Sequence, residues 1–131
     1  MFKFEYKMIN KYDVSNNAGF HFIIDSEYEY IEYFLLNNLG DITNRKLFKL
    51  SISKKEEIYN ILINNKDIFK LNSFIYLEGD NNYKEQFFIV ELDDLNREIK
   101  GYNLFKDDLI IVNVFNEIKD ILKDVMDINL Y

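Results

Sequence analysis

A chain of 131 residues without cysteine can form neither a disulfide-stapled scaffold nor a zinc–thiolate site, and it has no thiol nucleophile. Its 23 acidic and 16 basic residues give a formal net charge of −7, which argues against nonspecific nucleic-acid binding and favours attraction to a basic partner. No apolar run approaches the roughly 18 residues of a membrane span. We therefore expect a soluble, cytoplasmic protein that binds neither nucleic acid nor membrane.

The N-terminal residues alternate in polarity. Between residues 2 and 8 every second residue is apolar and the residues between them are charged, which predicts a strand with one buried face. Residues 13–19 are rich in Asn, Ser and Gly and predict a turn. Residues 20–24 predict a second strand that pairs back onto the first, so a hairpin is expected to open the fold.

Residues 26–29 have the form of a capping box. Ser26 could accept a hydrogen bond from the amide of Glu29, whose carboxylate could accept one from the amide of Ser26 in return. This pattern predicts a helix that runs to about Leu39 and stops at Gly40. On a helical wheel, one side of this helix is unusually aromatic for a solvent-facing surface. It carries Glu29, Tyr30, Glu32, Tyr33 and Leu36.

The middle of the chain predicts a strand, a helix and a second hairpin. Residues 47–52 are strand-like, and a second capping box that begins at Ser53 predicts a helix ending near residues 64–65. Residues 73–77 predict a strand, and residues 78–82 predict the turn that leads into the next strand.

The strand expected over residues 85–92 organises the rest of the fold. From residue 87 to residue 91 only one position is polar, whereas a strand with one face in water would alternate. We therefore expect it to lie in the middle of the sheet with both faces covered. Phe88 and Val90 would share one covered face, and Phe87 and Ile89 the other.

The C-terminal part has two interpretations. Residues 93–101 predict a polar connection, and the β-branched residues 109–114 are strand-like. An apolar set in the same region also fits one continuous helix, namely Ile111, Phe115, Ile118, Leu122 and Val125. The preferred interpretation is a strand to Val114 and a helix from about Asn116, whose side chain can cap it.

Together these segments predict an α+β protein. Residues 1–131 would form one globular domain, with a central, mostly antiparallel sheet of about five to six strands and about three helices packed on it.

Few residues have the chemistry of a catalytic or metal site. His21 is the only histidine and falls in an apolar strand, where a packed, hydrogen-bonded role is expected. A single histidine and no cysteine exclude a Cys–His pair and a multi-histidine metal site. The acidic pairs at residues 93–94 and 107–108 could hold a hard cation, but their spacing matches no calcium loop, and solvated turn residues explain them better.

A carboxylate arrangement of the kind found in metal-dependent nucleases is also conceivable. Asp80 could stand on one strand and the Glu-x-Lys tripeptide of residues 98–100 on the next. The same tripeptide form recurs at residues 5–7 and 117–119, so the match carries little information. We expect no catalytic residue, no bound metal and no cofactor.

Three segments resemble parts of the SUKH superfamily, a set of bacterial immunity proteins against secreted and contact-delivered toxins. Residues 30–40 resemble the family's helix that ends in Asn and Gly. Residues 74–80, with the strand after them, resemble its hairpin, and residues 115–118 with Leu122 resemble its terminal helix. The resemblance implies a cytoplasmic bacterial protein that binds and neutralises a cognate toxin and is not an enzyme.

The expected partner-binding surface is the acidic, tyrosine-bearing face of the first predicted helix. Tyrosine is enriched at interface hot spots, and carboxylates around it would steer a basic toxin domain such as a nuclease. Its residues are Glu29, Tyr30, Glu32 and Tyr33, and an acidic loop with Glu78, Asp80 and Tyr83 is a second candidate surface.

Other interpretations of these residues stay open. The tyrosines could instead lie under neighbouring loops. The alternative functions are a metal-dependent hydrolase that uses Asp80 and Glu98, and a self-associating structural or regulatory domain.

Overall fold

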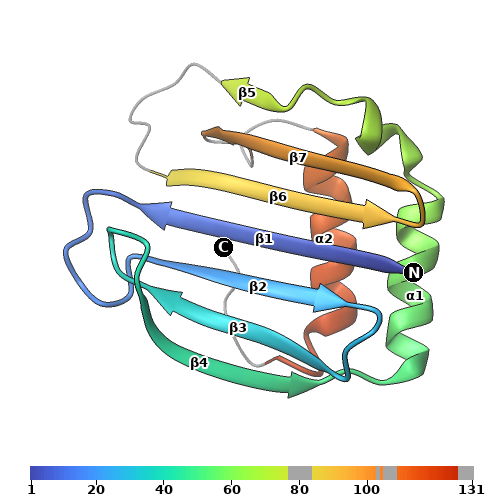
Figure 1. The fold of residues 1–131 in the computed structure, drawn as a ribbon, viewed down its shortest axis with the longest axis horizontal. Helices are drawn as coiled ribbons and strands as arrows, with labels where there is room; N and C mark the ends of the chain where they lie inside the picture. The colour runs from blue at the N-terminus through green and yellow to red at the C-terminus, as the bar shows by residue number, and fades with distance from the viewer. Residues whose placement is uncertain (77–83, 103, 105–108, 127–131) are drawn as a thin grey trace.

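A computed structural model describes residues 1–76, 84–102, 104 and 109–126 (Figure 1). In chain order its elements are β1 (Phe2–Asn10), β2 (Gly19–Asp25), β3 (Tyr30–Leu36), β4 (Ile42–Lys49), α1 (Ile52–Ile63), the 3₁₀ helix η1 (Lys66–Lys70), β5 (Phe74–Tyr76), β6 (Lys84–Leu92), β7 (Leu95–Tyr102) and α2 (Ile110–Leu122).

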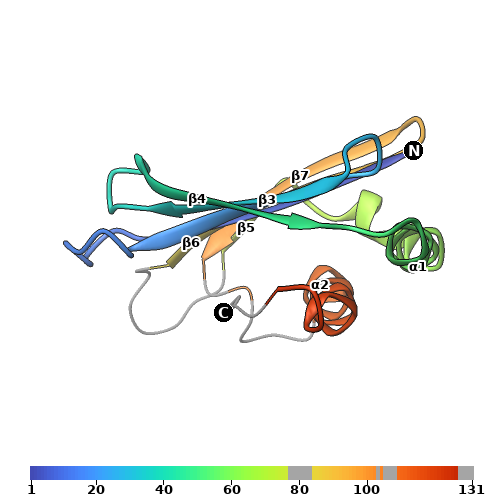
Figure 2. The same cartoon turned by 90° about the horizontal axis from the view of Figure 1, so that it is seen from below.

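The strands form one seven-stranded sheet in the order β4-β3-β2-β1-β6-β7-β5. All neighbouring strands are antiparallel except β5 and β7, which are parallel. Both α-helices lie on the same side of the sheet, and α1 packs against α2 (Figure 2). This confirms the α+β class with a mostly antiparallel sheet. The described residues contain seven strands, two α-helices and the 3₁₀ helix η1, whereas the sequence predicts five to six strands and about three helices. The other side of the sheet is called the open face below.

The N-terminal hairpin is confirmed. Phe4 and Tyr6 are fully buried on the helix-covered face of β1, and Tyr6 pairs with Phe22 of β2. A Cβ atom on Gly19, where β2 begins, would lie 2.0 Å from the carbonyl oxygen of Met8. Only glycine therefore lets the two strands approach this closely.

The prediction of a helix over residues 26–39 is wrong, because this segment forms a turn and then the strand β3. Ser26 does not cap a helix: its Oγ accepts a 2.9 Å hydrogen bond from the amide of Phe2. Ile31 and Tyr33 are buried two residues apart, as in a strand with one covered face. Gly40 has φ of +88° in the β3–β4 turn, so its left-handed backbone serves a hairpin and not a helix end.

The next strand and helix are displaced from their predicted limits. The strand expected over residues 47–52 is β4, which begins at Ile42 and ends at Lys49. The helix expected from Ser53 is α1, and its cap is Ser51, whose Oγ accepts a 3.2 Å hydrogen bond from the amide of Lys54. Its C-cap is Asn64, where the sequence places the end.

The central position of β6 is confirmed, but the expectation that both of its faces are covered is wrong. β6 lies between β1 and β7, and Phe88 and Val90 are fully buried under the helices. Phe87 and Ile89 are only half-buried, because they lie on the open face. The ammonium groups of Lys7 and Lys100 lie 5.6 and 5.1 Å from the centre of the Phe87 ring and partly cover it.

Two pairings near β6 also differ from expectation. Residues 93–101 are not a polar connection, because β7 pairs with β6 through a tight turn at Asp93, whose φ is +52°. The strand expected over residues 73–77 is β5, but it pairs in parallel with β7 and forms no hairpin with β6. The turn expected over residues 78–82 lies outside the described residues.

The C-terminal segment is one continuous helix, so the preferred strand over residues 109–114 is wrong. α2 begins after Leu109, and Asn116 lies inside it and does not cap it. The apolar residues that favour a continuous helix explain this, because α2 buries Ile111, Phe115, Ile118 and Leu122 against the core.

Aromatic rings fill the layer between the sheet and α2. The Tyr6 ring lies 4.7 Å from those of both Phe88 and Phe115, measured between centroids. The side-chain amide of Gln86 donates a 2.9 Å hydrogen bond to the Tyr6 hydroxyl, and burial raises the pKa of that hydroxyl. The carbonyl oxygen of the same amide accepts a 2.8 Å bond from the Leu104 backbone.

Candidate functional site

The start of β1 lies between two acidic turns. Lys3 of β1 pairs with Asp25 at the end of β2 and, on its other side, with Glu91 near the end of β6. Because β1 runs antiparallel to both neighbours, the turn after β2 and the turn after β6 meet at the same end of the sheet.

A cavity of about 230 Å³ opens between these turns. Four of its nine lining residues are carboxylates, and we call this cavity the acidic pocket. It is lined by Asp25, Glu27, Glu91 and Asp93, together with Met1, Phe2, Lys3, Leu95 and Asn96.

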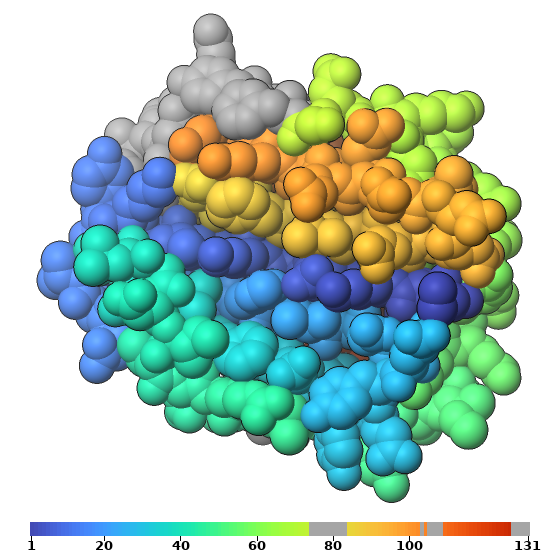
Figure 3. All heavy atoms as spheres, viewed as in Figure 1, coloured from blue at the N-terminus to red at the C-terminus, as the bar shows by residue number. Residues whose placement is uncertain are grey.

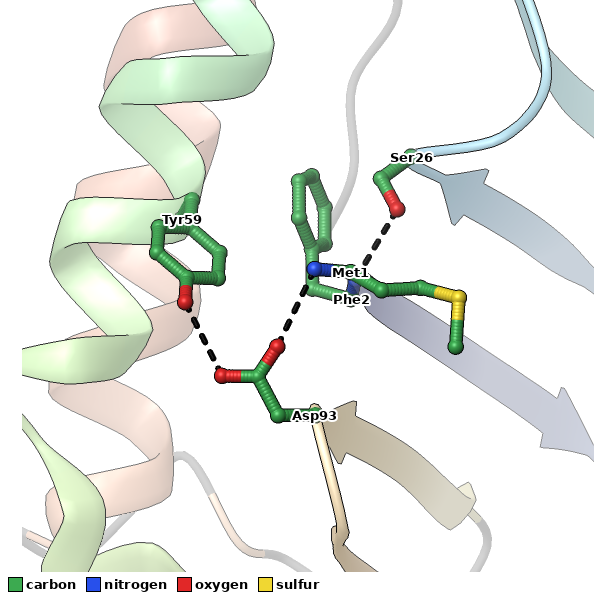
Figure 4. A network of polar contacts seen from close by, with 5 residues as sticks. All are labelled: Met1, Phe2, Ser26, Tyr59 and Asp93. Atoms are coloured by element: carbon green, nitrogen blue, oxygen red, sulfur yellow. Dashed lines mark hydrogen bonds and ion pairs between the residues drawn. The ribbon is translucent and has the colours of Figure 1, made fainter.

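Asp93 is held in place by a network that links the start of β1 to α1 (Figure 4). Its Oδ2 accepts a 2.9 Å hydrogen bond from the Tyr59 hydroxyl, and its Oδ1 lies 3.1 Å from the ammonium group of Met1. The Tyr59 hydrogen bond and the ammonium group lower the pKa of the Asp93 carboxyl below its ordinary value. Asp93 therefore stays ionised at the rim of the pocket.

The backbone around this network is fixed as well. The amide of Asp93 donates a 2.8 Å hydrogen bond to the carbonyl oxygen of Met1. The amide of Ser26 donates a 3.0 Å hydrogen bond to the carbonyl oxygen of Phe2. Both acidic turns are thus tied to β1 by backbone bonds.

The other three carboxylates of the acidic pocket differ in the partners that they already have. Oδ1 of Asp25 accepts a 2.9 Å bond from the amide of Glu27, and Lys3, the one basic side chain of the lining, pairs with Glu5 outside the pocket at 3.4 Å. Glu27 and Glu91 are exposed, and among the described residues neither takes part in an ion pair. These two carboxylates can accept hydrogen bonds from a cationic group of another molecule.

A second, larger cavity lies on the other side of Met1 and Phe2. It measures about 470 Å³ and is formed against α1 by Met1, Phe2, Ser26, Ile52, Lys55, Glu56, Tyr59 and Asn60. We call it the apolar groove after Met1, Phe2 and Ile52, although charged residues also line its α1 side. Ile52 is 75% exposed there, and the Phe2 ring packs 6.4 Å from that of Tyr59. An acidic pocket next to an apolar groove can hold the charged head of an arginine or lysine and an apolar neighbour of that side chain.

The structure separates the four residues of the predicted partner-binding face. Glu29 is exposed in the turn before β3, and Tyr30 and Glu32 lie on the open face. Tyr33 is 3% exposed on the helix-covered face, where its ring stacks on Phe20 at 5.7 Å. The expectation that these residues share one exposed face is therefore wrong, because a strand sends neighbouring side chains to opposite sides.

The other predicted sites are placed as follows. Glu32 is not free to steer a partner, because its Oε2 lies 2.8 Å from Nη2 of Arg45. Glu98 lies exposed on the open face of β7. Glu78, Asp80, Tyr83 and the acidic pair at residues 107–108 lie outside the described residues.

His21 has the hydrogen-bonded role that its sequence context predicts. Its Nε2 lies 3.1 Å from Oε1 of Glu5 on the open face. Burial raises the pKa of Glu5, but its hydrogen bond with His21 and its interactions with Lys3 outweigh burial and lower that pKa overall. Within the described residues no group of three His, Asp or Glu side chains is arranged to hold a metal ion.

Three members of the acidic pocket were not singled out from the sequence: Asp25, Glu27 and Glu91. The sequence predicts a helix start over residues 26–29, a strand over residues 85–92 and a polar connection over residues 93–101, and none of these expectations brings the three carboxylates together. Only the pairing of β1 with both β2 and β6 brings them together.

Neither a protein-family model nor a curated protein matches the sequence. No helix in the described part of the chain is long and apolar enough to cross a membrane.

Proposed function

We propose that this protein is an inhibitor that binds a cognate bacterial toxin domain and takes a basic side chain of that toxin into the acidic pocket. The observation that carries the proposal is the convergence of four carboxylates on a cavity of about 230 Å³ beside an apolar groove. Concave sites with a few convergent polar groups are where interface anchors bind, and arginine is enriched among such anchors.

The charge of the chain supports a basic partner. A net charge of −7 attracts a basic domain from a distance and raises its association rate. Glu27 and Glu91 then provide local acceptors, and the Ile52 side of the groove provides apolar contact area. Long-range attraction and short-range recognition thus act on the same end of the sheet.

An immunity role in the bacterial cytoplasm fits this binding chemistry. The segments that resemble the SUKH superfamily suggested that role, although residues 30–40 form a strand and a turn where the family has a helix. The proposal therefore rests on the acidic pocket and the net charge. The inhibitor acts by occupying the toxin and catalyses no reaction.

A growth assay tests this function. The proposal predicts that a gene for the cognate toxin lies beside this one. That toxin domain is expressed in bacteria with the wild-type protein, with the double variant Glu27→Gln and Glu91→Gln, or with the control Glu57→Gln, which changes an exposed carboxylate of α1 outside both cavities. Wild type and control should protect the cells, and the double variant should protect them poorly. A wild-type protein that neither binds nor protects would overturn the proposal.

A further inference from the structure

The open face is a broad surface that none of the helices in the described residues covers. Figure 3 views it directly, with the atoms of β1, β2, β6 and β7 in front, and Figure 1 shows in the same view that α2 lies behind these strands. Three apolar side chains near its centre, Ile23, Phe87 and Ile89, are only half-buried. An exposed patch of this kind marks an interaction surface in many proteins.

The strand register arranges the side chains of this face in two adjacent rows. Paired residues of neighbouring strands point to the same side, so each row crosses the sheet from β4 to β7. The basic row contains Arg45, Phe34, His21, Lys7, Phe87 and Lys100. The acidic row, two residues further along each strand, contains Leu47, Glu32, Ile23, Glu5, Ile89 and Glu98.

Contacts with aromatic rings restrict the cationic side chains of the basic row. Lys7 and Lys100 lie on either side of the Phe87 ring, and the guanidinium group of Arg45 lies 5.9 Å from the centre of the Phe34 ring. The long aliphatic parts of such side chains lie along the rings, so less conformational entropy is lost when the face becomes buried.

The charges of this face indicate which kind of partner fits it. The basic row has three Lys or Arg residues and the acidic row has three Glu residues, so the two rows together are neutral, whereas the whole chain carries −7. Neither a strongly basic nor a strongly acidic partner finds a complementary field there. A molecule with the same two rows finds a complementary field, because its basic row can face the acidic row of this chain, and its acidic row the basic row.

We propose that a second copy of this chain covers the open face and forms a two-fold symmetric dimer. The two-fold axis runs across the strands between the two rows, so that the basic row of each copy faces the acidic row of the other. At the centre of the stack Lys7 faces Glu5 of the other copy, and Phe87 faces Ile89. The twist of both sheets separates the outer strands, so the contact is closest over β1, β2 and β6.

The two rows cross the six strands from β4 to β7. Six strands spaced about 4.8 Å apart and about seven residues long span roughly 650 Å² in projection, against the ~800 Å² that a standard interface buries on each partner. The face therefore approaches the standard size when the outer strands also take part. Lys3, Asp25 and Glu91 of the acidic pocket form the next row beyond the acidic row, at the edge of this face. Glu27 and Asp93 lie in the turns beyond the strands, so the outer side of the pocket stays accessible at the rim of the dimer.

Sedimentation equilibrium over a range of protein concentrations tests the dimer without any toxin. Wild type should dimerise. Lys7→Glu places two carboxylates opposite each other and should raise the dimer dissociation constant at least tenfold, which is about 1.4 kcal/mol. The control Lys123→Glu makes the same charge change on an exposed residue after α2 and should leave that constant unchanged within about twofold. A wild-type monomer at every concentration, or a dimer equally strong in Lys7→Glu, overturns the proposal.

Chemical cross-linking of the wild-type protein keeps the test independent of how the variants fold. Equal amounts of ¹⁴N-labelled and ¹⁵N-labelled chains are mixed and treated with a carbodiimide, which joins a lysine to a carboxylate in direct contact. Peptides that join Lys7 of one label to Glu5 of the other are expected. Mixed-label peptides that map only to other surfaces overturn the proposed face. This result is independent of the proposed toxin inhibition, because the acidic pocket takes no part in it.

Discussion

The hydroxyl of Tyr59 donates a 2.9 Å hydrogen bond to the Asp93 carboxylate, and this contact joins α1 to the turn between β6 and β7. Helix and turn are far apart in the sequence, yet together they flank the first residues of β1. The contact therefore fixes the wall between the acidic pocket and the apolar groove.

Replacing Tyr59 by phenylalanine should raise the pKa of Asp93 toward its ordinary value of 3.8, because the hydrogen bond that favours the ionised carboxylate is lost. Because the folded-state pKa is lowered, Asp93 stabilises the fold above its ordinary pKa, and this contribution is lost as the pH falls through the lowered value. An NMR titration of the carboxyl carbon measures the change. Tyr28→Phe, which removes a hydroxyl that makes no bond to Asp93, should leave the titration as in wild type. If Tyr59→Phe leaves the titration of Asp93 unaltered, the Tyr59 hydrogen bond does not lower the pKa of Asp93.

The two faces of β6 should differ in their contribution to stability. Phe88 is fully buried among aromatic rings, so Phe88→Ala should lower the free energy of unfolding by about 3 to 5 kcal/mol. Phe87 is half-buried beneath two lysine side chains, so Phe87→Ala should cost less than about 2 kcal/mol. Urea denaturation of dilute samples compares the two. Equal losses would show that both faces of β6 are covered in the single chain.

The buried side-chain amide of Gln86 should hold the backbone at Leu104 in place. Its oxygen accepts a 2.8 Å hydrogen bond from the Leu104 amide, and Gln86 is 1% exposed. Gln86→Leu leaves that amide without this acceptor, so the free energy of unfolding should fall by about 1 to 3 kcal/mol. Hydrogen exchange at the Leu104 amide should also become faster. A variant with unchanged stability and unchanged exchange would show that this hydrogen bond contributes nothing.

Glu85 should make part of the fold sensitive to acid. Burial raises the pKa of its carboxyl, but hydrogen bonds from Lys11 and Lys100 outweigh burial and lower that pKa below 4.5. The ionised form therefore adds stability above pH 4.5, and this contribution is lost as the pH falls through the lowered pKa.

Thermal unfolding between pH 7 and pH 3 measures this dependence. Glu85→Gln should flatten the fall of the melting temperature with acid, whereas Glu98→Gln, on the exposed side of β7, should follow the wild-type curve. Parallel curves for wild type and Glu85→Gln would exclude Glu85 as a source of the acid sensitivity.

Local sequence patterns predict the first hairpin and the fold class because their signals are short-range. The alternation of residues 2–8 needs only the two-residue period of a strand, and the turn residues before Gly19 stand beside it. The same reasoning fails at β3. A capping box precedes it, and a bulge between Leu35 and Leu36 interrupts its alternation, so the apolar spacing imitates a helix.

The acidic pocket and the open face depend on long-range pairing that periodicity does not encode. Asp25 and Glu91 become neighbours only because β1 lies between their strands. The apolar run of β6 predicts two covered faces, but Lys7 and Lys100 reach the Phe87 ring from the strands on either side. Lysine side chains can cover an aromatic ring without a second layer of helices.

Binding kinetics test most directly whether the acidic pocket receives a basic side chain of a toxin, as we propose. Surface-based measurements at several salt concentrations would follow the binding of the proposed cognate toxin domain to wild type, to the Glu27→Gln and Glu91→Gln double variant, and to Glu57→Gln. Association with wild type should slow as salt rises, because a Debye length of about 10 Å at 0.1 M screens the attraction.

The double variant should dissociate at least tenfold faster from the toxin, because the ionic hydrogen bonds in the pocket are lost, and Glu57→Gln should dissociate at the wild-type rate. A folded double variant that binds the toxin with wild-type kinetics at every salt concentration would contradict the account.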